Sequence, residues 1–221
     1  NAKNIEDEDS DYEIKLWLDP TDKTAYYYAE PEKVYLNENS RQMFYYEEPL
    51  AWWDSDGWFN NIRDIDLSGF DTSQVTNMGY MFWSMRNLTS LDLSNFDTSK
   101  VTSMDGMFYG MRRLTSLDLS NFDTSNVTNM IDMFRDMSNL TTLDLSNFDT
   151  SKVKYMSGMF NDLHNLTSLD LSNFDTSQVT DMPRMFCLED GDIFKDKLEK
   201  IYVNNDFNTT KLTSSYGMFR N

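Results

Sequence analysis

The chain has 221 residues, a formal net charge of −18 at pH 7 and one cysteine, Cys187. This acidic excess argues against binding to nucleic acid or to an anionic membrane surface, because both need a basic face on the protein. The single cysteine excludes an internal disulfide, and no apolar run is long enough for a transmembrane helix, so we expect no membrane insertion within this chain.

The N-terminal part predicts a linker followed by a hairpin. Residues 1–11 are acidic and polar, which is typical of a disordered linker. The segments EIKLWL (13–18) and TAYYYA (24–29) then flank the sequence DPTDK, in which Pro20 suits a tight turn. We therefore expect residues 12–33 to form a β-hairpin that caps the N-terminal end of the following domain.

One phrase then recurs every 26 residues. IDLSGFDTS occupies 65–73, and LDLSNFDTS occupies 91–99, 117–125, 143–151 and 169–177. A fixed period of this length indicates a solenoid, in which each repeat forms one coil. Within a unit, Leu91 and Leu93 alternate with the polar Asp92, and this alternation predicts a short strand with one buried face. Strands that recur once per coil would stack as a parallel sheet.

The second half of each unit has another apolar spacing. Val101, Met104, Met107 and Met111 recur at intervals of three or four residues, which is typical of one face of a short helix. Between the two halves, each unit contains one phenylalanine in a turn-forming sequence. We expect these rings to stack as an internal spine: Phe70, Phe96, Phe122, Phe148 and Phe174.

Degenerate units close the array at both ends. Residues 33–44 predict a shortened first unit with Val34 and Leu36 inward, and residues 198–219 predict a last unit with Ile201 and Val203 at the strand positions. The predicted solenoid spans residues 34–221. Its units start near Val34, Ile65, Leu91, Leu117, Leu143, Leu169 and Ile201.

With its LxxLxL strand, its DTSxVTxMxxMF turn and its final IYV…MF unit, the sequence resembles the BspA-type leucine-rich repeats of bacterial surface proteins, of the lactobacillus-type 26-residue kind. The resemblance covers about residues 33–221. It implies an α/β solenoid: a right-handed leucine-rich-repeat array with short parallel strands, short helical turns and an N-terminal β-hairpin cap. It also implies a secreted or cell-surface protein with a role in adhesion, and it defines no ligand.

The outward residue in the middle of each predicted strand is an aspartate. Strands in a sheet lie about 4.7–4.9 Å apart, so these carboxylates should repel one another, and we expect a raised pKa for the central Asp118. The row predicts a concave binding strip for a cationic or hydroxyl-rich ligand; the alternative is a solvated polar face copied by recent duplication. The strip comprises Asp66, Asp92, Asp118, Asp144 and Asp170, with Tyr35 and Tyr202 where the column would continue.

A second row of aspartates precedes each Thr-Ser pair. An aspartate in a turn commonly accepts a hydrogen bond from the backbone two residues on, and we expect this role here. Calcium binding is the alternative, although no EF-hand spacing is present. The row consists of Asp71, Asp97, Asp123, Asp149 and Asp175.

No motif predicts catalysis. The sequence lacks a nucleophile elbow, a P-loop, a zinc-protease motif and a glycine-rich dinucleotide turn. The only histidine, His164, is expected on the surface. We therefore expect no enzyme and no cofactor. The leading hypothesis is a monomeric module that binds an extracellular protein or glycan; the alternative is a spacer that presents another domain and has no ligand of its own.

Overall fold

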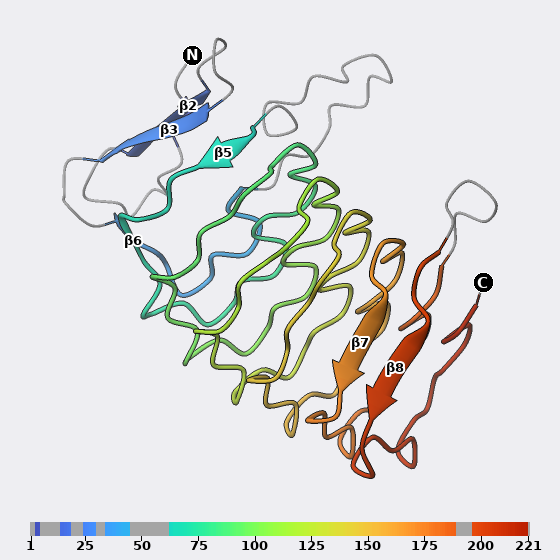
Figure 1. Cartoon of the computed structure of the whole chain (residues 1–221). Helices are drawn as coiled ribbons and strands as arrows, with labels where there is room; N and C mark the ends of the chain where they lie inside the picture. Colours follow the sequence, from blue (N-terminus) through green and yellow to red (C-terminus); the bar gives the residue numbers. More distant parts are fainter. Residues whose placement is uncertain are drawn as a thin grey trace.

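The computed structural model describes residues 3–4, 14–18, 24–29, 34–44, 62–188 and 196–220. From residue 34 onward, the described chain winds in successive coils that stack on one another (Figure 1). Parallel bridges join one residue of each coil to the equivalent residue of the next. The bridged residues are Asn39, Asn77, Ser103, Asn129, Tyr155, Asp181 and Ser214.

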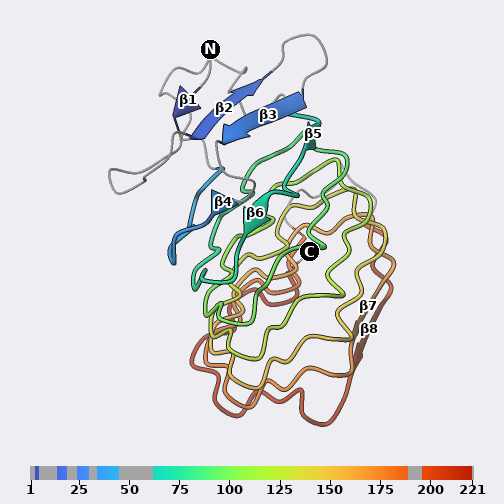
Figure 2. The same cartoon turned by 90° about the vertical axis from the view of Figure 1, so that its left-hand side faces the viewer.

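A small sheet lies at the N-terminal end of the stack (Figure 2). Its strands are β1 (Lys3–Asn4), β2 (Ile14–Leu18), β3 (Thr24–Ala29) and β5 (Asp64–Ile65), in that order. β2 and β3 pair antiparallel, and β3 pairs parallel with β5, the start of the first full coil. Because β1 pairs with β2, part of the expected linker is structured. The rest of residues 1–13 lies outside the described residues.

Two further pairs of strands set the register of the end units. At the C-terminal end, β7 (Ser168–Leu171) pairs parallel with β8 (Lys200–Val203), which places Ile201 beside Leu169 as the repeat predicts. At the other end, β4 (Val34–Tyr35) pairs parallel with β6 (Phe70–Asp71). Val34 therefore aligns with the phenylalanine of the repeat and not with its first leucine. The short first unit corresponds to the second half of a full coil.

None of the described residues forms a helix that is long and apolar enough to cross a membrane. The second half of each coil is not the expected helix. The predicted apolar residues are buried, but they lie on consecutive turns. Alternate N–H groups, such as those of Met104, Gly106 and Phe108, donate to carbonyls of the next coil at 2.7–3.0 Å. Left-handed backbone at Gly106 and Gly110 further interrupts any helical path. A helix would need those N–H groups for bonds within the coil.

The LDLS segments form a strand ladder only at β7 and β8. In the other coils, side chains bind the backbone groups there instead. Asn121 donates through Nδ2 to the carbonyls of Leu93 and Phe96 in the preceding coil, at 3.0 and 2.9 Å. The same pair of bonds recurs at Asn95, Asn147 and Asn173. The asparagine of the repeated phrase thus ties neighbouring coils together, because it hydrogen-bonds each coil to the preceding one.

A buried threonine makes a second tie between coils. Thr124 Oγ1 donates to the Asp149 carbonyl at 3.0 Å and accepts from the Asp149 N–H at 2.8 Å. Reciprocal bonds of this kind satisfy both backbone groups where water cannot reach them. Equivalent pairs recur at Thr72, Thr98 and Thr150.

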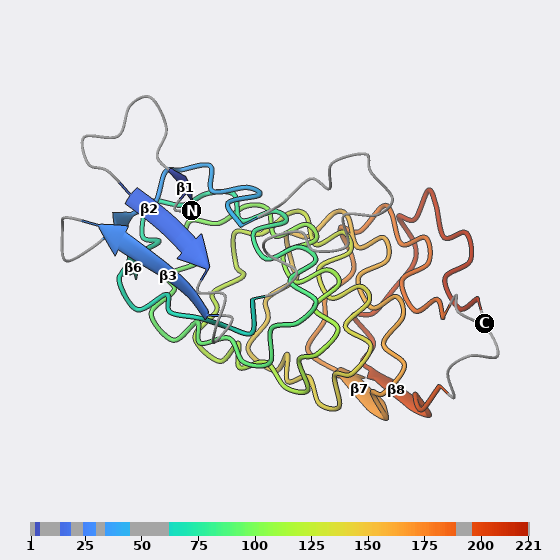
Figure 3. The same ribbon diagram turned by 90° about the horizontal axis from the view of Figure 1, so that it is seen from above.

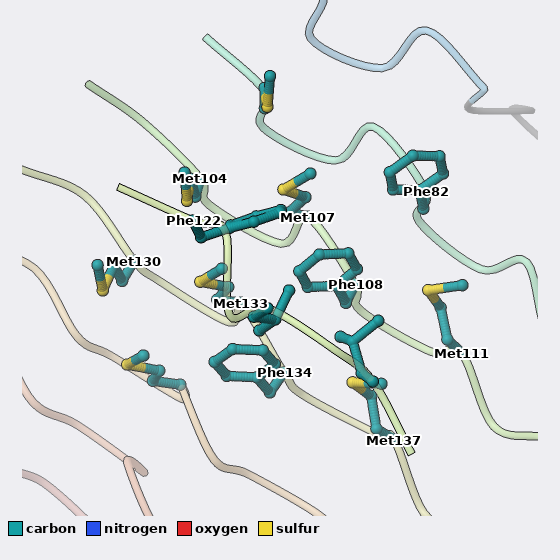
Figure 4. Packing of buried hydrophobic residues seen from close by; sticks show 14 of the residues in the cluster. Phe82, Met104, Met107, Phe108, Met111, Phe122, Met130, Met133, Phe134 and Met137 are labelled. Carbon is teal, nitrogen blue, oxygen red and sulfur yellow. The ribbon is translucent and has the colours of Figure 1, made fainter. Parts of the chain in front are cut away.

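The continuous ring stack is not the predicted one. The stacked rings are those of the MF pair, with centroids 5.2–6.1 Å apart and planes within 5–14° (Figure 4). They are Phe44, Phe82, Phe108, Phe134, Phe160, Phe186 and Phe219. The predicted spine residues are buried beside this stack, and four of them meet it at 40–44°, as Phe122 meets Phe108.

Candidate functional site

The five aspartates of the predicted strip lie exposed on successive coils. Each one accepts a hydrogen bond through Oδ1 from the backbone N–H two residues later, at 2.9–3.0 Å. Asp118, for example, binds the Ser120 N–H. The LDLS phrase therefore needs an acceptor at this position to turn the chain, and this local role was missed from the sequence.

These hydrogen bonds determine how the carboxyls ionise. Bonds from Ser120, first from its backbone and then from its hydroxyl, lower the pKa of Asp118 below the ordinary value. The expectation of a raised pKa at Asp118 is wrong. Repulsion from neighbours does raise the pKa of Asp144, but it is the smallest contribution, and the serine bonds lower that pKa overall. The same direction holds for Asp66, Asp92 and Asp170. At neutral pH the row is a line of ionised carboxylates.

The two tyrosines lie in different columns. Tyr202 pairs with Asp170 across β7 and β8 and is 49% exposed, so it continues the row. Tyr35 pairs with Asp71 across β4 and β6, so it extends the second acidic row instead. The expectation that Tyr35 continues the strip is wrong, because VYL aligns with the FDT part of the repeat.

The second acidic row forms the predicted turns. Each carboxylate accepts from the N–H of the serine two residues on at 2.8–2.9 Å, as Asp123 does from Ser125. No group of three or more His, Cys, Asp or Glu among the described residues is arranged to hold a metal ion. The calcium alternative therefore gains no support from the described part of the chain.

No salt bridge within the described residues neutralises the first acidic row. The arginines that form ion pairs lie in the second half of their units, the part made of consecutive turns, which we call the turn side. Arg41 reaches Asp105 at 2.7 Å, and Arg112 reaches Asp136 at 2.6 Å. The exposed carboxylates of the first row thus have no cationic partner among the described residues, whereas Asp105 and Asp136 are each paired with an arginine.

A row of aromatic rings on the turn side was not predicted. Tyr80, Trp83 and Tyr109 meet edge to face at 5.9–6.0 Å. Arg41 lies over the Tyr80 ring and Arg135 over the Tyr109 ring, at 4.6 and 5.4 Å from the centroids. These residues occupy positions at which the units differ from one another, so the repeat itself carries no signal for them. Their mutual contacts indicate packing between coils.

The histidine is buried, contrary to the sequence-based expectation. His164 is 2% exposed, and its Nδ1 lies 2.6 Å from Asp196 Oδ1. The Lys197 N–H also donates to the His164 carbonyl. Because Asp196 and Lys197 end the insertion that separates the last two coils, His164 anchors that segment. This contact between separate coils has no signature in the repeat.

Comparison with known families gives one result. The sequence model described as "Mycoplasma protein of unknown function, DUF285" matches residues 53–143 and again residues 132–221. The two matches together cover residues 53–221, which contain every copy of the repeated phrase. Comparisons with curated proteins and with solved structures found no match.

Proposed function

The chain belongs to the DUF285 family, and we propose that it is a non-enzymatic binding module, secreted or held on a bacterial cell surface, that attaches to an extracellular protein or glycan. We also propose that its stacked coils are a right-handed leucine-rich-repeat solenoid of the BspA type. The stacking of 26-residue units and the buried repeat residues support this assignment of the fold.

One observation carries the proposed function: the five exposed carboxylates on successive coils are ionised and have no described cationic partner. A regular line of uncompensated charge attracts a cationic partner and holds it in register. Tyr202 adds an exposed ring at the end of the line. A ring of this kind packs on the apolar face of a sugar or of a protein side chain.

The second candidate is a spacer without a ligand. The Asx turns favour it, because they give every aspartate of the row a structural use. The two candidates differ in whether the protein needs the negative charge of the aspartate row. A spacer needs the acceptor oxygen but not the negative charge, whereas a binding strip needs both.

Replacement of all five aspartates of the row by asparagine separates the two candidates. Asparagine keeps an acceptor for the serine N–H and removes only the charge. The matched control makes the same five changes in the second acidic row: Asp71, Asp97, Asp123, Asp149 and Asp175. The purified proteins are applied to an array of extracellular-matrix proteins and glycans at low and at physiological salt.

We expect the parent and the control to bind the same array members, and the first-row variant to bind at least tenfold more weakly. Added salt should weaken the parent in the same way, since it screens exposed charges. Unchanged binding by the first-row variant, or no binding by a folded parent, would move the conclusion to the spacer.

A further inference from the structure

Four arginines gather on one part of a chain whose net charge is −18. Arg63, Arg86, Arg112 and Arg113 lie within five residues before the first three copies of the repeated phrase, and all four are exposed. We call this part of each coil, which joins the turn side to the phrase, the corner. Figure 3 shows the coils side by side along the stack, and neighbouring strands lie about 4.7–4.9 Å apart. The arginines therefore lie close together on three successive coils.

The corner of these coils carries a local excess of positive charge. Residues 75–91 and 106–117 contain three of the arginines and no Asp or Glu. Two carboxylates lie nearby: Asp64 follows Arg63 in the chain, and Asp136 forms a salt bridge with Arg112 at 2.6 Å, which leaves the Arg112 side chain 49% exposed. The other three arginines have no salt bridge within the described residues. Exposed charges act over only about 8 Å at physiological ionic strength, so this local excess decides what binds here.

One of the arginines replaces a residue that ties coils together elsewhere. At the position of Arg113 in later units, Asn139 donates through Nδ2 to the Arg112 carbonyl at 2.8 Å, and Asn165 donates to the Ser138 carbonyl at 2.7 Å. Arg113 makes no equivalent bond among the described residues. This coil thus presents an exposed cation in place of a stabilising hydrogen bond. Such a departure from the structural pattern of a repeat is expected at functional positions.

The chemistry of the corner favours a polar partner with repeated negative charges. A guanidinium group binds a carboxylate or a similar planar face of oxygens through two parallel hydrogen bonds. The exposed hydroxyls of Thr115 and Ser116 lie next to Arg113 in the chain and can bond to sugar hydroxyls. A protein partner would need an apolar centre, and single-stranded nucleic acid would need exposed rings for its bases. No exposed large apolar or aromatic side chain of the described residues lies at this corner.

We propose that Arg63, Arg86, Arg112 and Arg113 form a binding site for an anionic polysaccharide, a sugar polymer with repeated carboxylate or sulfate groups. The polymer runs across the three coils, so that successive acidic groups meet guanidinium groups of successive coils. The site shares no residue with the aspartate row and takes a ligand of the opposite charge. Either proposal can therefore fail alone.

Two immobilised polymers provide the test: dextran sulfate as the sulfate probe and a polyuronate as the carboxylate probe, with neutral dextran as the blank. The double variant Arg86→Ser, Arg113→Asn introduces the residues that a later unit has at 138 and 139, so its coils should stack normally. We expect the parent to bind at least one of the two polymers at physiological salt, and the double variant to bind it at least tenfold more weakly. Added salt should weaken the parent, because it screens these exposed charges.

A second double variant is the matched control. Lys100→Gln, Lys152→Asn removes two exposed positive charges elsewhere on the coils and introduces the residues that other units have at 74 and 126, so it should bind within twofold of the parent. The variant with asparagine throughout the aspartate row should bind at least as tightly as the parent, because it removes like charge from the chain. Absence of binding to both polymers, an equal loss in the lysine variant, loss of binding in the aspartate-row variant, or equally tight binding of single-stranded DNA would overturn the proposal.

Discussion

At the scale of single residues, the repeated phrase is explained by what each side chain does for the backbone. Leu93 and Leu119 are buried, Asn121 ties two coils, Asp118 closes a turn, and Thr124 satisfies both backbone groups of a residue in the next coil. Because each coil packs against a coil of the same kind, the same hydrogen-bonding side chain is needed at the same position of every unit. The invariance of the phrase is thus a structural requirement before it is a functional one.

Asp118 provides the test of this interpretation. Because hydrogen bonds lower its folded pKa, its contribution to stability is present above the unfolded pKa of about 3.9 and is lost as the pH falls through the folded pKa. Asp118→Ala should therefore lower the Tm at pH 7, and the difference from the parent should shrink toward pH 2. Asp118→Asn keeps a neutral acceptor but loses the charge that strengthens these bonds, so it should melt between Asp118→Ala and the parent at pH 7. Thermal melts at several pH values measure both effects.

The opposite outcome is also informative. If repulsion along the row dominated, Asp118→Asn would melt above the parent at pH 7 and the difference would vanish in acid. Such a result would mean that the serine hydrogen bonds contribute less than the neighbouring charges.

At the scale of one coil, apolar spacing predicts burial well but conformation poorly. Met104, Met107 and Phe108 are fully buried, as their spacing predicts, yet they lie on turns. Intervals of three and four residues are shared by a helix and by a succession of turns, so the pattern alone cannot separate them. One signal was present: Gly106, Gly158 and Gly217 recur at one position of the repeat, and all three have positive φ.

The arrangement of the phenylalanine rings is also only partly predictable from the apolar spacing. Both phenylalanine positions recur with the period of the repeat, so the sequence predicts that both are buried but not which of them stacks. Only the MF ring of each coil, such as Phe134, lies face to face with its equivalents in both neighbouring coils, Phe108 and Phe160. Phe122 instead meets Phe108 at an angle. Which of the two rings stacks depends on how the rings of neighbouring coils are oriented, and the sequence pattern does not specify that orientation.

We expect Phe134→Ala and Phe122→Ala each to lower the free energy of unfolding by about 3–5 kcal/mol, with the larger loss at Phe134. Both side chains are buried, but only Phe134 also loses two face-to-face contacts, and stacked aromatic pairs add about 0.5–1.5 kcal/mol beyond burial. Urea denaturation of the two variants measures the difference. A larger loss at Phe122 would restore the originally predicted spine as the main ring contact.

At the scale of the whole molecule, the stack has a direction. In each coil, alternate N–H groups of the second half donate to the following coil and the carbonyls accept from the preceding one. The first coil therefore presents carbonyls at its outer edge, and the last coil presents donors. The two edges of the described stack are therefore chemically different, a polarity that a periodic sequence does not reveal.

The cover of the N-terminal end is tested by deletion. Among the described residues no coil precedes Val34, yet Val34, Leu36 and Phe44 are buried, so residues outside the coils shield them. β3 pairs with β5, which places the β2–β3 pair against the start of the stack. Deletion of residues 1–33 would leave β5 without its partner strand and the first coil with an exposed apolar face. Exposed edges and apolar faces of this kind associate.

We therefore expect the 1–33 deletion to form dimers or larger aggregates and to melt below the parent. Deletion of residues 1–11 alone is the control, because it removes β1, which pairs with β2 and does not touch the stack through a described strand pair. Size-exclusion chromatography with light scattering measures the mass of each variant. A 1–33 deletion that stays monomeric and keeps the parent's Tm would show that the hairpin is not the cap and that other residues cover Phe44.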